Sequence, residues 1–168
     1  MKTKFKLFAL AMFLSLPFLS QAQFSVGLGA MYNLQSGAGF AYGGRLMYGI
    51  NEQIRLSGEY AFYASSTTSG AGYSSSVTET NLNVHYFFGD TKSDMKFYAL
   101  GGLNIYTASV TFTGSGSLSA SSTGVNLGVG GETKLSDALT LLGEAKYELH
   151  DGGSVVIGAT VAYTFGGK

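Results

Sequence analysis

The stretch Ile54-Arg55-Leu56-Ser57-Gly58-Glu59-Tyr60-Ala61-Phe62 alternates between two kinds of residue. Apolar side chains and one glycine take every second position, and both charged residues fall on the positions between them. Successive side chains of a β-strand point to opposite faces, so this period of two predicts a strand with one apolar and one polar face. The same period recurs along most of the chain.

Eight such strands are predicted, at residues 24–34, 41–50, 54–64, 77–88, 95–112, 124–135, 139–149 and 154–165. Short turns follow the second, fourth and sixth strands, whereas the longest connections, Ser65 to Ser76 and Thr113 to Thr123, follow the third and fifth. An even strand number with short turns at one end is typical of a bacterial outer-membrane barrel, whose short turns are periplasmic. We therefore predict an all-β fold, an eight-stranded antiparallel up-and-down transmembrane β-barrel with the N- and C-termini in the periplasm.

The first 22 residues have the pattern of a secretion signal. Lys2, Lys4 and Lys6 make a basic start, and residues 7–19 are almost entirely apolar. Ser20-Gln21-Ala22 then offers small residues around a cleavage site. The apolar run is too short for a membrane-spanning helix, which needs roughly 20 residues. We predict a signal peptide at residues 1–22 and one barrel domain at residues 23–168.

The composition suits a protein surrounded by lipid. Charged residues make up 12% of the chain, about half of the roughly 25% found in soluble domains. Three of the ten basic residues lie in the predicted signal, so the remainder is acidic overall and gives no reason to expect nucleic acid as a partner. Cysteine is absent, which excludes disulfides, thiolate metal sites and a lipoprotein's acylated cysteine.

The charged face of the strands also carries most of their glycines, as the crowded lumen of an eight-stranded barrel requires. That face holds five basic and five acidic residues: Arg45, Arg55, Lys96, Lys134, Lys146, Glu59, Glu79, Glu132, Glu144 and Glu148. Because an unpaired buried charge is costly, we predict that they pair in a network that plugs the lumen. A narrow pore is the alternative.

Aromatic side chains gather toward both ends of the predicted strands. We place one group near the periplasmic rim: Phe24, Tyr48, Phe88, Phe97, Tyr163 and Phe165. We place a second group toward the outer rim: Tyr32, Tyr42, Tyr60, Phe62 and Tyr147. Two aromatic belts flank the apolar band of membrane barrels. A soluble barrel with an apolar lumen is disfavoured, because its exterior would carry few charges and many glycines.

Three features together resemble a known family: the signal at Met1 to Ala22, the eight alternating strands, and the closing Val161-Ala162-Tyr163-Thr164-Phe165. They resemble the small outer-membrane β-barrel domain family, with OmpA- and OmpX-type barrels. The resemblance implies contact with outer-membrane lipid and insertion by the barrel-assembly machinery, which reads an aromatic last strand. Gly166-Gly167-Lys168 follows that strand here, a departure from the family's pattern. The resemblance implies no cofactor.

Some eight-stranded outer-membrane barrels are lipid A deacylases, which use a histidine and a serine on the lipid-facing side. His150-Asp151 with Ser154 is the one local group that fits such chemistry, and the expected His-x-Ser spacing is missing. His85 falls on the lumen face, where a hydrogen-bonded interior histidine is the ordinary interpretation. We predict no catalysis, no cofactor and no metal site, with the lipid A-modifying enzyme as the alternative.

The fifth strand changes its pattern near the predicted outer rim. Its alternation shifts parity after Tyr106, before Val110 and Phe112, as a bulge would produce. An edge that protrudes from the membrane could pair with an extracellular strand. We therefore predict a structural or surface-interaction role, with an extracellular partner at the loops 65–76 and 113–123. A flexible cap without a ligand is the alternative.

Overall fold

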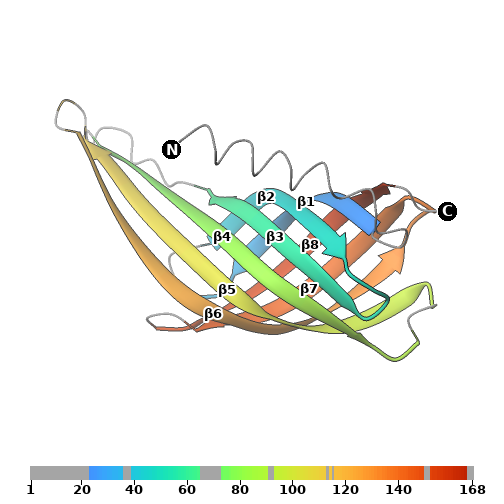
Figure 1. The fold of residues 1–168 in the computed structure, drawn as a ribbon. Helices are drawn as coiled ribbons and strands as arrows, with labels where there is room; N and C mark the ends of the chain where they lie inside the picture. Colours follow the sequence, from blue (N-terminus) through green and yellow to red (C-terminus); the bar gives the residue numbers. More distant parts are fainter. Residues whose placement is uncertain are drawn as a thin grey trace, which may run out of the picture.

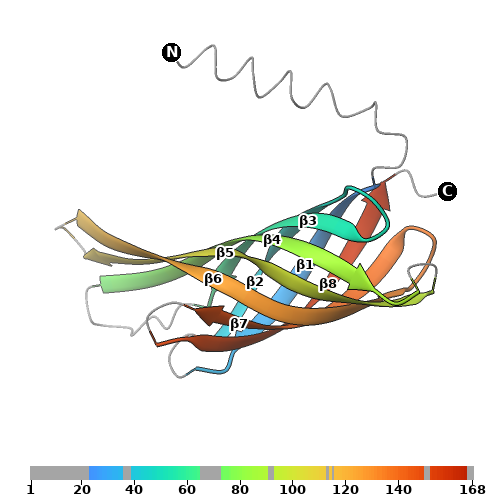
Figure 2. The same ribbon diagram turned by 60° about the horizontal axis from the view of Figure 1, so that its bottom comes forward.

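The computed structural model describes residues 23–35, 39–64, 73–90, 93–112, 114, 116–149 and 152–165. These residues form eight strands: β1 (Gln23–Asn33), β2 (Gly39–Gly49), β3 (Ile54–Tyr63), β4 (Tyr73–Phe88), β5 (Met95–Phe112), β6 (Gly116–Lys134), β7 (Leu139–Leu149) and β8 (Ser154–Phe165). Each strand pairs with its neighbours in sequence, and β1 pairs antiparallel with β8 to close the barrel (Figures 1 and 2). The predicted fold class is confirmed. The predicted signal peptide lies outside the described residues.

Among the residues that the structure describes, no helix is long and apolar enough to cross a membrane.

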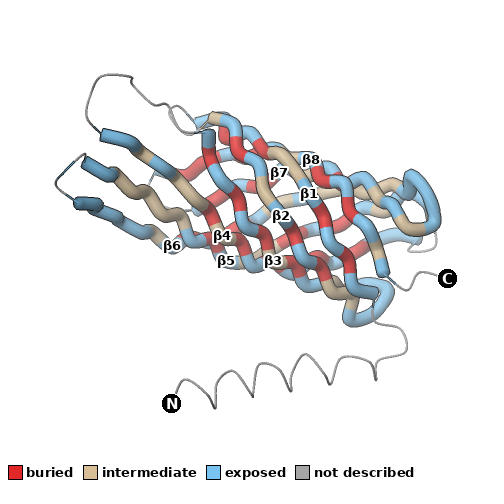
Figure 3. The backbone as a smooth tube through the Cα atoms, turned by 90° about the horizontal axis from the view of Figure 1, so that it is seen from above, coloured by how far each residue is buried: buried red, intermediate tan, exposed pale blue. Residues whose placement is uncertain are grey.

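The side chains alternate between the lumen and the outer wall along every strand. Buried and exposed positions follow one another along the tube in Figure 3, and the large exposed side chains of the wall are apolar or aromatic. Leu28 is 75% exposed on the outer wall, whereas Arg45 and Glu59 are 5% and 7% exposed on the lumen side. The apolar face therefore points away from the lumen, as expected of a barrel in lipid.

Two apolar layers fill the bore on either side of its polar middle. The first lies toward the end where Gln23 and Phe165 are found, which we call the terminal end; it contains Met47, Phe87, Tyr98, Leu100, Leu142 and Ala162. The second lies toward the opposite end, which we call the extended end; it contains Met31, Ala41, Ala61, Tyr63 and Val156. The charged side chains of the lumen lie between and beside these layers.

Three strands reach past the others at the extended end (Figures 1 and 3). The pairing of β3 with β4 stops at Tyr63 and Val77, and that of β6 with β7 stops at Val125 and Leu149. In contrast, β5 continues to pair with both β4 and β6 as far as Phe112. Residues 73–76, 104–112 and 116–124 thus form a three-stranded sheet, which we call the extended sheet.

Both predicted loops, Ser65 to Ser76 and Thr113 to Thr123, are partly wrong, because some of their residues are strand in the extended sheet. Residues 73–76 belong to β4 and residues 116–123 belong to β6, although their serine, threonine and glycine content suggested loop. Both segments pair with β5 along one edge, and hydroxyl pairs across β5 and β6 add to this pairing: Thr107 with Ser121 at 3.0 Å, and Thr111 with Ser117 at 3.0 Å. Of the remaining predicted loop residues, Gly114 lies in a turn, and residues 65–72, 113 and 115 lie outside the described part of the chain.

The predicted bulge after Tyr106 is wrong. The register of β5 with β4 runs without a skipped residue from Phe97 opposite Phe88 to Phe112 opposite Tyr73. The parity of the side chains is therefore unchanged, and what changes is which face is apolar. At the tip, Gly114 and Gly116 have φ angles of 84° and 97°, a conformation that glycine adopts without strain.

Candidate functional site

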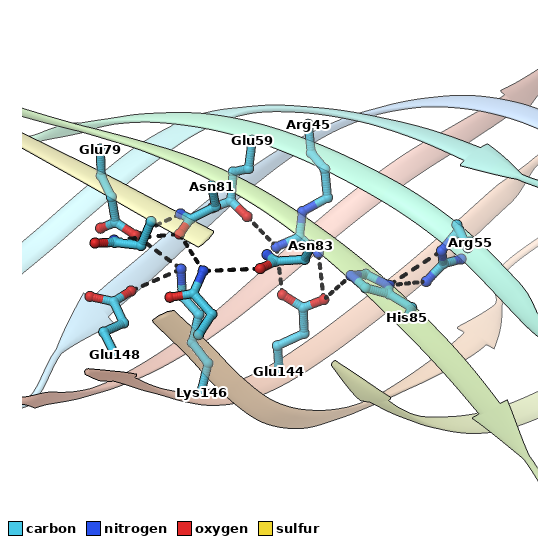
Figure 4. A network of polar contacts seen from close by, with 12 residues as sticks. Arg45, Arg55, Glu59, Glu79, Asn81, Asn83, His85, Glu144, Lys146 and Glu148 are labelled. Atoms are coloured by element: carbon cyan, nitrogen blue, oxygen red, sulfur yellow. Dashed lines mark hydrogen bonds and ion pairs between the residues drawn. The ribbon is translucent and has the colours of Figure 1, made fainter. Parts of the chain in front are cut away.

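The central part of the lumen is organised around Arg45 on β2. Its guanidinium group contacts Glu59 on the neighbouring strand β3 at 2.5 Å, and it holds Glu144 of β7, on the other side of the bore, with two bonds of 2.5 and 2.6 Å (Figure 4). The hydroxyl group of Tyr98 donates to the same Glu144 carboxylate at 2.7 Å. A bidentate arginine–carboxylate pair is strong and directional, so it ties opposite walls together.

A second arginine, Arg55 of β3, extends this group of side chains toward the terminal end. We call the whole group the central cluster: Arg45, Arg55, Glu59, His85, Tyr98, Glu132 and Glu144. Arg55 donates to His85 Nδ1 at 3.1 Å (Figure 4). It also donates to Glu132 at 2.6 Å. Because Nδ1 accepts from arginine, the ring proton of a neutral His85 lies on Nε2, which is 3.8 Å from Glu144. The His85 ring stacks on Tyr98 with centroids 4.6 Å apart and an interplanar angle of 3°.

The outer cluster lies nearer the extended end and is centred on Lys146 of β7. Its ammonium group lies 3.0 Å from Glu79 and 2.9 Å from Glu148, so two carboxylates share one cation. The hydroxyl group of Tyr63 donates to Glu79 at 2.6 Å, and Ser154 donates to Glu148 at 3.2 Å. Each carboxylate therefore has a hydrogen-bond donor besides the lysine.

Asparagine amides extend the outer cluster along the β4–β6 side of the bore. Asn126 donates to Asn81 at 2.7 Å and to Asn83 at 2.9 Å, and Asn81 in turn donates to Glu79 at 2.6 Å (Figure 4). These amides are almost fully buried. Sequence reasoning did not include them in the site, although their inward parity on β4 and β6 is the signal that would have found them.

The space left inside the bore is small. A cavity of about 10 Å³ lies beside Arg45, Glu59 and Glu144, which is room for about one water molecule. A larger polar space of about 130 Å³ opens at the terminal end, and Lys96 and Lys134 line it together with Asp94 and Asp137. Eight of the ten predicted lumen charges thus take part in ion pairs. Lys96 and Lys134 lie at the terminal mouth and form none with the residues that the structure describes.

The predicted belt residues all point outward. Phe24 pairs with Tyr48 and with Phe165, and Phe88 pairs with Phe97. At the other end, Tyr32 lies opposite Phe40, which the prediction missed, and the Tyr42 ring stacks on Phe62. The remaining predicted belt residues, Tyr60, Tyr147 and Tyr163, are also exposed on the outer wall.

The candidate deacylase group is only partly described. His150 and Asp151 lie outside the described residues. Ser154 is 2% exposed and lies inside the bore, where Asn33 donates to its hydroxyl at 3.2 Å. A lipid on the outer wall does not reach this hydroxyl. Within the described residues, no group of three or more histidine, aspartate or glutamate side chains is placed to hold a metal ion.

A closed antiparallel barrel with an apolar outer wall and a charged lumen defines a transmembrane β-barrel. The sequence pattern of the outer membrane protein beta-barrel domain matches residues 7–165, and the chain belongs to this family. It is therefore an outer-membrane β-barrel protein. No match to a curated protein was found.

Solved structures of low sequence identity share the fold. The N-terminal β-barrel domain of OprF from Pseudomonas aeruginosa is 17% identical with a TM-score of 0.69, covering 86% of this chain and 98% of that one. Ail, the attachment invasion locus protein of Yersinia pestis, is 18% identical with a TM-score of 0.62, covering 86% and 97%. Neisserial surface protein A is 21% identical with a TM-score of 0.61, covering 86% and 97%.

Proposed function

We propose that the protein is a closed barrel with a structural and surface-interaction role, and that its extended sheet binds a partner strand outside the cell. In this arrangement the termini and the turns at residues 50–53, 89–94 and 135–138 are periplasmic, because outer-membrane barrels keep their short turns on that side. The outer wall contacts membrane lipid, and the barrel-assembly machinery reads the aromatic strand β8 during insertion.

Lumen closure supports a role that does not depend on transport. The central and outer clusters cross the bore between two apolar layers, and the cavity beside Arg45 has room for about one water molecule. A solute would have to break several buried ion pairs at once, which is strongly unfavourable.

The free edge of β6 carries the binding proposal. Residues 116–124 pair with β5 on one side, and among the described residues no strand pairs with them on the other. Natural edge strands are protected by charges, proline or bulges. Residues 116–124 contain no charged residue and no proline, and their register with β5 is continuous. Such an edge is suited to strand addition by an extended peptide.

A peptide-binding measurement tests the proposal. The probe is a fluorescent nine-residue peptide of alternating threonine and valine, and the target is the folded protein in detergent micelles. A shortened variant, in which Asn-Gly replaces residues 109–119, joins Ala108 to its pairing partner Ala120 and removes the tip of the extended sheet. We expect binding to the wild type and much weaker binding to the shortened variant, which keeps only residues 120–124 of the free edge. Both should migrate as folded barrels on unheated gels.

Two controls sharpen this measurement. The same peptide N-methylated at every residue has no backbone N–H to donate to the edge strand from either side, and it should not bind. Sucrose octasulfate, the heparin analogue held in another Ail structure, should not bind the extended sheet here, because that sheet has no basic residue. Equal binding of the peptide to wild type and shortened variant, or no binding to either, would contradict the proposed function.

A further inference from the structure

The two faces of the extended sheet differ sharply in chemistry. The parity that places Leu100 and Asn104 in the lumen continues to Val110 and Phe112, so the lumen side of the sheet becomes mainly apolar above the barrel. Ser75 and Ser122 are its polar side chains there. On the opposite face, every position of the other parity from 107 to 111 and from 117 to 123 is serine or threonine. Within the barrel the arrangement is reversed, with apolar side chains outside.

This reversal marks where the outer wall leaves the lipid. The last large apolar side chains on the outer wall of β5 and β6 are Ile105 and Val125, both exposed. Beyond them, Thr107 and Thr123 begin the hydroxyl face. A wall in contact with hydrocarbon must be apolar, and one above it gains by being polar. The hydroxyl face therefore looks toward the polar layer around the barrel.

The apolar face looks across the mouth of the barrel, and its larger side chains remain exposed. Its larger members are Tyr73, Val110, Phe112 and Leu118, with Ala108 and Ala120 between them. Tyr73, Phe112 and Leu118 remain 44%, 47% and 72% exposed. The rings of Tyr73 and Phe112 are in contact, with centroids 6.4 Å apart. An exposed apolar cluster of this kind marks a surface for another molecule.

We infer that the partner is an uncharged extended segment of another protein with an apolar side chain at every second position. This inference rests on the proposed function and specifies its partner. The free edge at 116–124 borders the apolar face at Leu118 and Ala120, so an added strand brings its own alternate side chains onto both faces. Apolar residues then extend the apolar face, and small polar residues meet the hydroxyl face.

Two peptides of identical composition test this inference. The first alternates threonine and valine, and the second arranges them in pairs, so that as a strand it places valine on both faces. Both can form the same backbone hydrogen bonds. We expect the alternating peptide to bind the folded protein in micelles about tenfold more tightly, because each misplaced valine loses its burial against the apolar face. Fluorescence anisotropy provides the affinities.

Two neighbouring substitutions provide a matched control within the protein. Leu118→Thr removes an apolar side chain from the apolar face, and Ser119→Thr changes the hydroxyl face while both keep a residue suited to a strand. We expect L118T to weaken binding of the alternating peptide about tenfold and S119T to leave it unchanged. Heat-modifiable gel migration establishes that both variants are folded.

The outcomes separate the inference from the proposed function. Equal affinity for both peptides with no effect of L118T would overturn the inference and leave edge binding intact, whereas no binding of either peptide would overturn both. A stable dimer that sedimentation detects in the absence of peptide, and that L118T disrupts, would assign the apolar face to a second copy and reject a separate partner.

Discussion

The ring of Tyr98 occupies the space that a side chain at Gly130 would fill. A Cβ atom at position 130 would lie 2.4 Å from Tyr98 Cζ, and Tyr98 itself is fully buried. The missing side chain lets the ring lie flat against His85 and lets its hydroxyl reach Glu144. One glycine therefore positions an aromatic residue that takes part in both the apolar layer and the central cluster.

Gly130→Ala should displace this ring and destabilise the barrel. A rigid ring in a packed interior has little room to move, and overpacking typically costs about 1 to 3 kcal/mol. Gly143→Ala is the matched control, because a Cβ there meets no atom within 4 Å. Urea unfolding of both variants in lipid vesicles measures the free energy of unfolding. Equal stability of the two variants would show that the Tyr98 ring is not confined by position 130.

Lys146→Met should be among the most destabilising single substitutions in the lumen. It leaves Glu79 and Glu148 side by side without the cation that they share. Removing one partner of a buried ion pair costs about 3 to 5 kcal/mol. Lys134→Met at the exposed terminal mouth should change the free energy of unfolding by no more than about 0.5 kcal/mol. A loss below 1 kcal/mol for K146M would mean that water already solvates the outer cluster.

The wild-type barrel should show no large, steady conductance in planar lipid bilayers. The bidentate contact of Arg45 with Glu144 crosses the bore, and Tyr98 lies beside it. A double variant, Arg45→Ala with Tyr98→Ala, removes both obstacles and should show open events where the wild type shows none. A steady open level of the wild type would refute the closed lumen.

The period of two was enough to predict the eight strands and which side chains face inward, because parity alone decides the face. It was not enough to predict the pairing of the charges. Arg45 and Glu144 are 99 residues apart and meet only once the closed barrel sets their heights. The aligned pair Arg45 and Glu59 depends on the β2–β3 register. Both are properties of the barrel and not of any one strand.

The extended sheet was hidden by its composition. Residues 116–123 are rich in serine, threonine and glycine, a composition that suits a loop as well as the polar face of a strand. What makes them a strand is their pairing with β5, and a local sequence pattern does not reveal that pairing. The apparent parity shift after Tyr106 has two physical explanations. Either a bulge turns the side chains to the opposite face, or the strand leaves the lipid and its apolar residues move to the other face. The continuous register of β5 with β4 supports the second explanation.

The lipid A of cells that produce the protein should keep its acyl chains. His85 is enclosed by Arg55, Tyr98 and Glu144, and Ser154 lies inside the bore. Mass spectrometry of lipid A from cells with and without the protein makes the comparison. An acyl chain that is missing in the presence of the protein, and that returns with His150→Ala or Ser154→Ala, would establish a deacylase instead of a binding barrel.

The extended end should be accessible from outside the cell and the terminal end should not. The chain contains no cysteine, so a single introduced cysteine is a unique label site. Ser119→Cys lies on the hydroxyl face of the extended sheet, and Ser136→Cys lies in the turn between β6 and β7 at the terminal end. A maleimide carrying a polymer too large for porins should label S119C in intact cells and S136C only after the outer membrane is opened. Labelling of S136C in intact cells, with protection of S119C, would reverse the proposed orientation and place the binding sheet in the periplasm.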